Sequence, residues 1–193
     1  ETYPSTKKQF DLLNLLADEL RGLGVEDVRQ DEWGYVMATV PSNLPTDHND
    51  AVPTIGFLAH VDTSPDVTGA NVKPQVIDSY DGGVIVLPAD NSQKIDPAEN
   101  PYLKKIVGAT LVTTDGTTLL GGDDKAGVAE IMSAMTYLLA HPEIKHGPIA
   151  VAFTPDEEIG KGTKHFDIEK FGAKYAYTLD GAEGGGIQHE TFS

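Results

Sequence analysis

The sequence contains no cysteine and no long apolar run, and both absences narrow what the protein can be. Without thiols there is no disulfide bond and no thiolate metal site, so His, Asp and Glu must hold any metal ion. The same absence fits a reducing compartment, and we expect a cytoplasmic location. No stretch approaches the roughly 20 apolar residues of a membrane-spanning helix, so we expect no membrane partner.

Basic side chains are also scarce. Lys and Arg number 14 against 30 Asp and Glu, which leaves a net charge of −16. Nucleic-acid binding requires a basic face, so we expect no nucleic-acid partner. Hydrophobic residues make up 39% of the 193 residues, which is ordinary for a globular protein and enough for one sizeable core.

The most informative stretch is 55–62, which reads IGFLAHVD. Its apolar residues predict a buried strand, with His60 and Asp62 where the strand ends. In an extended chain, side chains at i and i+2 leave the same face. An imidazole beside a carboxylate is typical of a metal-bound histidine whose ring the acid orients. A surface His beside a surface Asp in a turn is the other interpretation of this stretch alone.

Apolar periodicity predicts a mixture of helices and strands in the rest of the chain. Helices are expected at 5–23, 128–139 and 167–171. Strands are expected at 149–153 and 175–179, and hairpins at 28–40 and 111–120. Ser5 or Thr6 is positioned to cap the first helix. The polar excursion at 63–103 is either a functional rim or an inert insertion.

Strands that alternate with helices predict an α/β fold with a largely parallel mixed sheet sandwiched by helices. In such sheets, sites form beyond the carboxyl ends of the strands. Acidic or His-bearing turns follow three of the apolar strands, and Asp123-Asp124 opens a helix. Each cluster alone is commonly solvated surface or helix capping. Because all of them follow apolar runs, we expect them to converge on one rim.

Convergence would bring about five carboxylates into one cleft, namely Asp62, Asp123, Glu157, Glu158 and Asp180. Several would have to be protonated unless cations lie among them. Two divalent cations would compensate the charge, and a pair of Zn²⁺ ions fits histidine and carboxylate donors best. Zinc lowers the pKa of a bound water to about 7, so a carboxylate that is not a ligand can take its proton. The adjacent Glu157 and Glu158 can divide these two roles.

Four motifs together resemble the peptidase T family of zinc tripeptidases, which is grouped with carboxypeptidase G and the aminoacylases. They are HVDTSPD at 60–66, LLGGDDKAG at 119–127, FTPDEEIG at 153–160 and TLDG at 178–181. The resemblance runs over essentially the whole chain. It implies a zinc exopeptidase-like catalytic domain, a small peptide substrate, and removal of the N-terminal residue from tripeptides.

By position, the resemblance also implies roles for six residues. His60 and Asp180 would bind the first Zn²⁺ ion, and Glu158 would bind the second. Asp123 would bridge both ions, next to a cis bond to Asp124. Asp62 would orient His60, and Glu157 would be the general base.

The resemblance further implies that the catalytic domain is incomplete in this chain. Residues 1–183 would form its N-terminal part, and 184–193 would begin the connection into a lid domain that is absent. The last histidine ligand of the second ion would lie outside this chain rather than at His189. We therefore expect the chain alone to be weakly active or inactive, and a homodimer would form through the missing lid domain.

Other functions stay open. The same metal centre could serve a dipeptidase or an N-acyl amino acid deacylase. A non-catalytic metal-binding or partner-binding domain is a second class, against which the presence of Glu157 argues. Acidic strand ends could also hold Mg²⁺ in a phosphotransferase, although the imidazole of His60 favours zinc.

Overall fold

The computed structural model describes residues 2–45, 52–181 and 186–188, and it divides into two compact units. The first unit combines Glu1–Ser64 with Gly122–Asp180, and the second contains Pro65–Gly121. His48, His189 and most of the expected lid connection at 184–193 lie outside the described residues. None of the helices in the described ranges has the length and apolar character that a bilayer crossing requires.

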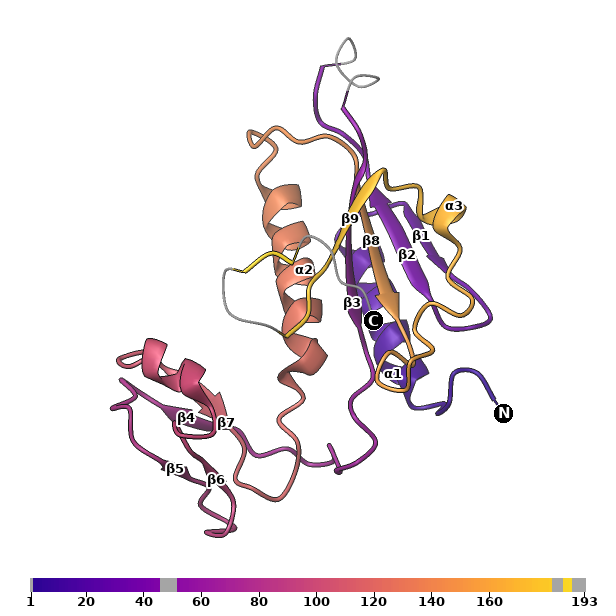
Figure 1. Ribbon diagram of the computed structural model, residues 1–193. Helices are drawn as coiled ribbons and strands as arrows, with labels where there is room; N and C mark the ends of the chain where they lie inside the picture. Colours follow the sequence, from indigo (N-terminus) through magenta and orange to yellow (C-terminus); the bar gives the residue numbers. More distant parts are fainter. Residues whose placement is uncertain (1, 46–51, 182–185, 189–193) are drawn as a thin grey trace. The chain divides into compact units, whose positions relative to one another are not determined.

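A five-stranded sheet in the order β1-β2-β8-β3-β9 forms the centre of the first unit (Figure 1). Its strands are β1 (Asp27–Gln30), β2 (Val36–Val40), β3 (Ile55–His60), β8 (Ile149–Thr154) and β9 (Tyr175–Thr178). Strand β3 pairs in parallel with both β8 and β9, whereas β2 pairs antiparallel with β1 and β8. Of these five strands, β2 therefore runs against the other four. The predicted α/β class with a largely parallel mixed sheet is confirmed.

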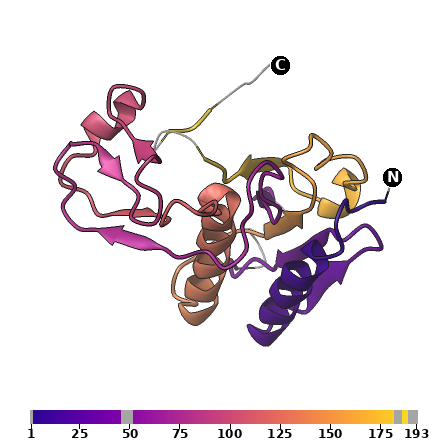
Figure 2. The same cartoon turned by 90° about the horizontal axis from the view of Figure 1, so that it is seen from below.

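Helices cover both faces of this sheet. Helices α1 (Gln9–Gly22) and α2 (Gly122–Ala140) lie on one face, and the short α3 (Ile168–Phe171) lies on the other (Figure 2). Alternate residues of β8 serve the two faces: Val151 and Phe153 join the core under α1 and α2, whereas Ala150 and Ala152 pack with Phe171. Both faces of β8 are thus buried, as expected for an interior strand.

The first helix begins later than its periodicity predicts. It starts at Gln9, its N-cap is Lys8, and no side chain caps it. The predicted cap by Ser5 or Thr6 is wrong. The Ser5 hydroxyl instead donates to the carboxylate of Asp156, 151 positions along the chain. The Ser5 hydroxyl, which the local sequence predicted to cap the helix, therefore forms a hydrogen bond with a residue distant in the chain.

The second unit is built from short strands and a 3₁₀ helix. These elements are β4 (Gln75–Ile77), β5 (Ile85–Val86), β6 (Lys94–Ile95), η2 (Pro101–Lys105) and β7 (Leu111–Thr113). Its small core contains Tyr80, Ile85 and Leu103. The excursion after β3 is therefore folded.

Strand β7 pairs antiparallel with β4, so the hairpin predicted at 111–120 is wrong. The carboxylate of Asp115 accepts hydrogen bonds from both the N–H and the hydroxyl of Thr117, which closes a tight local turn. The chain then leaves β7, and the N–H of Leu119 donates to the carbonyl of Thr68. Strand β7 thus pairs with β4, which lies earlier in the chain, rather than with the residues that directly follow it.

Candidate metal centre

His60 is the last residue of β3, and its side chain is 1% exposed. Because β3 is paired on both sides, its end is fixed relative to the ends of β8 and β9. His60 pairs with Thr154, and Leu58 pairs with Thr178. This register puts the turns after β8 and β9 beside His60, so the convergence expected from the sequence occurs.

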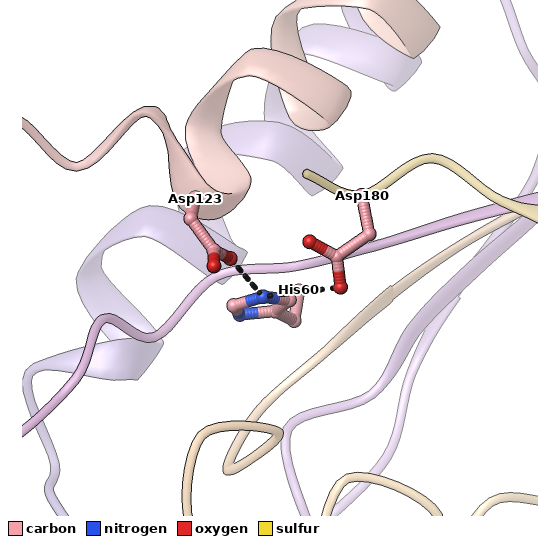
Figure 3. Close-up of side chains that lie close together, drawn as sticks. All are labelled: His60, Asp123 and Asp180. Atoms are coloured by element: carbon pink, nitrogen blue, oxygen red, sulfur yellow. Dashed lines mark hydrogen bonds and ion pairs between the residues drawn. The ribbon is translucent and has the colours of Figure 1, made fainter. Parts of the chain in front are cut away.

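Three carboxylates approach the Nε2 atom of His60. Asp123 Oδ1 lies 2.8 Å away, Glu157 Oε2 3.7 Å and Asp180 Oδ2 3.8 Å. They come from the start of α2, the turn after β8 and the residue shortly after β9. Figure 3 shows the Asp123 and Asp180 carboxylates directed toward the imidazole ring.

The residues in this group fit a divalent cation. His60, Asp123 and Asp180 each offer one ligand atom, and these atoms lie within 4.8 Å of one another. In a tetrahedral zinc site with bonds of 2.0–2.2 Å, ligand atoms are about 3.4 Å apart. Small side-chain rotations would bring the three to that spacing. One imidazole with several carboxylates is a donor set that suits zinc.

Asp62 lies on the other side of the imidazole. Its Oδ1 is 3.3 Å and its backbone oxygen 3.1 Å from the Nδ1 atom of His60. The two carboxylate oxygens also accept the backbone N–H groups of Glu157 and Glu158, both at 3.0 Å. Asp62 therefore connects the ring of His60 to the turn that carries the two glutamates.

The charges around His60 shift its protonation. Burial opposes the positive imidazolium, but the hydrogen bond to Asp62 and the charges of Asp62 and Asp124 outweigh burial and raise the pKa of His60 to about 9. Burial by itself raises the pKa of Asp62. The hydrogen bonds from His60 and from two backbone N–H groups outweigh that effect, so the pKa of Asp62 lies below its usual value. The pair is thus an imidazolium and a carboxylate at neutral pH.

The two glutamates occupy different surroundings. The Glu157 side chain is 49% exposed, and its carboxylate faces Nε2 of His60. Its pKa is raised, first by burial and then by the charges of Asp180, Asp62 and Glu158, against the opposing effect of His60. Glu158 lies outside the group formed by His60, Asp123 and Asp180. Of the five carboxylates that the sequence grouped with His60, the structure thus brings four around its imidazole, and it holds Glu158 next to them through Asp62.

Asp124 is a buried support to which the sequence assigned no role of its own. It is 1% exposed, and its carboxylate accepts the backbone N–H groups of His60 at 3.0 Å and Gly127 at 3.2 Å. Burial is the main reason that its pKa rises to about 6, with the charge of Asp180 acting in the same direction. The bond between Asp123 and Asp124 is cis. The sequence DDK at 123–125 shows that an acidic residue is present, but it predicts neither the burial of that residue nor its hydrogen-bond partners.

A close approach at Gly127 brings α2 to the end of β9. A Cβ atom there would lie 2.2 Å from the backbone oxygen of Leu179 and 2.5 Å from Asp124 Oδ1. No real Cβ makes such contacts, so only glycine permits this packing. Asp123 and Asp180, which lie on either side of this contact, thereby come close to the same imidazole nitrogen.

Comparison with known proteins agrees with this geometry. Residues 112–192 match the model of peptidase family M20/M25/M40. The whole chain is 58% identical to peptidase T of Alkaliphilus oremlandii and covers 47% of that protein. A crystal structure of aminopeptidase PepT from Bacillus cereus matches 91% of this chain with 39% of its own, at a TM-score of 0.65 and 31% identity.

A second solved structure, a tripeptidase from Staphylococcus aureus, matches 89% of this chain with 38% of its own, at a TM-score of 0.61 and 27% identity. The chain therefore spans about half the length of the curated relatives it matches.

Proposed function

Because the chain resembles peptidase T over its whole length, as its motifs predict, we propose that the protein containing it is a zinc-dependent tripeptidase. The proposed reaction removes the N-terminal residue of a tripeptide. The observation that carries the proposal is the arrangement at Nε2 of His60. Asp123 and Asp180 lie there as potential ligands, and a third carboxylate, that of Glu157, faces the same atom.

We assign two ions to this centre. His60 and Asp180 would bind the first, Asp123 would be shared, and Glu158 would bind the second. The grouping of His60, Asp123 and Asp180 supports the first ion, whereas the second rests on the resemblance. When bound, the ions would lower the pKa of a coordinated water and polarise the carbonyl of the peptide bond.

Glu157 is the proposed general base. A base has to lie near the reacting water without being consumed as a ligand, and its pKa should approach the working pH. Glu157 is half-exposed, lies outside the ligand group and has a raised pKa. Asp62 would hold the imidazole of His60 in the orientation that directs Nε2 at the metal, as acidic partners of metal-bound histidines do.

The substrate class is tested by comparing substrates. The natural protein that contains this chain would be depleted of metal, reconstituted with zinc, and given tripeptides, dipeptides and N-acyl amino acids. We expect cleavage of tripeptides with a free N-terminus. Cleavage of acyl amino acids without cleavage of tripeptides would make the protein a deacylase.

The role of Glu157 is tested by Glu157→Gln, which removes the proton acceptor and keeps the side-chain shape. We expect zinc content to be retained and kcat to fall by orders of magnitude, at least about 100-fold. Glu143→Gln is the matched control, because Glu143 also contacts a histidine but lies on the surface beside His141. Unchanged kcat in Glu157→Gln would remove Glu157 from the base role.

A further inference from the structure

A second hydrogen-bond network lies directly before Glu157 in the chain. Its centre is Asp156, which is 1% exposed and adopts a φ of +58°. The carboxylate accepts the Ser5 hydroxyl at 2.6 Å and the Gln9 amide at 2.7 Å on Oδ1, and the Ser5 backbone N–H at 2.8 Å on Oδ2. The backbone N–H of Asp156 donates to Oε1 of Gln9 at 3.0 Å.

The contact between Asp156 and Gln9 is reciprocal and buried. Gln9 is 8% exposed, and its side-chain amide meets both the carboxylate and the backbone N–H of Asp156. A buried carboxylate without such donors would be strongly unfavourable. A non-glycine residue with positive φ is also held only where its surroundings fix it. The start of α1 therefore determines the backbone at Asp156.

The same turn is fixed from its other side by Asp62. The N–H groups of Glu157 and Glu158 donate to Asp62, and the N–H of Lys161 closes the turn on the carbonyl of Asp156. Two anchors thus hold the segment 156–161, one inside the metal centre and one outside it. The outer anchor precedes the proposed base by a single residue.

We infer that Gln9 and Ser5 are positioning residues that act through Asp156 and hold the Glu157 carboxylate facing His60 Nε2. The inference rests on the proposed function, because it gives these residues a part in that reaction. Neither Gln9 nor Ser5 is within the metal group. If the network is broken, the turn loses its outer anchor and keeps its own backbone hydrogen bonds and the contacts of Glu157 and Glu158 with Asp62.

The test is an exchange of the amide and carboxylate groups. In Gln9→Glu two carboxylates face each other. In Asp156→Asn the new amide nitrogen faces either Nε2 of Gln9 or the backbone N–H of Ser5, which are both donors, so each single variant breaks part of the network. The double variant Gln9→Glu/Asp156→Asn restores it, because the Asn amide can donate to the Glu carboxylate. Ser5→Ala is a milder variant at an exposed residue. Asp167→Ala, which removes the side chain that caps α3, is the control for loss of a structural hydrogen bond.

In the zinc-loaded natural protein, we expect each single variant to lower kcat about 10- to 100-fold with KM unchanged, as for a displaced catalytic group. The double variant should recover most of kcat, Ser5→Ala should lose less, and Asp167→Ala should lose stability with kcat unchanged. Single variants with lower Tm and normal kcat would overturn the inference, and so would a double variant without recovery.

Crystal structures of wild type and Gln9→Glu give a readout that needs no turnover. We expect the Glu157 carboxylate to move by about 1 Å or more from its place beside His60. An unmoved Glu157 overturns the inference even if the wild type cleaves no tripeptide. Absence of cleavage by the wild type would count against the proposed function alone.

Discussion

Zinc binding should release about one proton from His60 at pH 7. The imidazole is surrounded by carboxylates, and its pKa in the metal-free protein is about 9. It is therefore an imidazolium at neutral pH, held by Asp62 on one side and Asp123 on the other. A metal ion binds only the neutral imidazole, so binding has to displace the proton.

The expected release follows from the pKa. A group with a pKa of about 9 is about 99% protonated at pH 7, whereas an ordinary histidine with a pKa of about 6.5 is about 24% protonated. Release should thus be about one proton rather than about a quarter of one. Asp124, with a pKa of about 6, is mostly ionised at pH 7 and adds no more than about 0.1 proton to the release. Zinc affinity should rise about tenfold per pH unit between pH 7 and 9.

The assay is titration calorimetry of zinc into metal-free protein, in buffers with different enthalpies of ionisation. The dependence of the heat on buffer enthalpy gives the number of protons released. Asp62→Asn should lower the release, because the hydrogen bond to Asp62 is the main contribution that raises the pKa of His60. His141→Gln is the control, since His141 lies on the surface beside Glu143, and it should leave the release unchanged. A release near a quarter of a proton, with affinity independent of pH above 7, would refute the reasoning.

Three further predictions concern stability. The raised pKa of His60 should stabilise the metal-free fold by on the order of 3 kcal/mol below pH 6.5, and this stabilisation should be lost as pH rises through about 9. Urea unfolding at a series of pH values measures the loss, and His60→Gln should make the free energy of unfolding less dependent on pH. Gly127→Ala should lower the free energy of unfolding by about 1–3 kcal/mol and weaken zinc binding, because the new methyl group would collide with the backbone of Leu179. Gly22→Ala should do neither, since no heavy atom lies within 4 Å of the position of its Cβ. Denaturation and calorimetry measure both effects, and equal behaviour of the two variants would contradict the prediction. Leu20→Ala in the core should lower the free energy of unfolding by about 2–5 kcal/mol, whereas Leu15→Ala, at a residue that is 52% exposed, should lower it by less than about 0.5 kcal/mol. Equal losses would mean that α1 does not bury this face in the core.

The pattern of apolar residues along the chain predicted much of the fold, because residues that face the core recur with the period of a helix or a strand. The apolar run at 55–62 predicted β3, and the pattern at 28–40 predicted the β1–β2 hairpin. Where a local signal competed with a distant partner, the pattern failed. The 111–120 hairpin is replaced by pairing of β7 with β4, and the Ser5 hydroxyl bonds Asp156 rather than a helix end.

The sequence by itself determined the chemistry of the centre. Without cysteine, histidine and acidic side chains were the ligand types left for a metal ion, and parallel strands bring the ones at their carboxyl ends to one edge. Tertiary structure alone decided how these groups are held. The Asp124 carboxylate under His60 and the contact between Gln9 and Asp156, 147 positions apart, depend on which segments pack together. No spacing along the chain encodes such a contact, because its geometry exists only once the sheet and both helices have assembled.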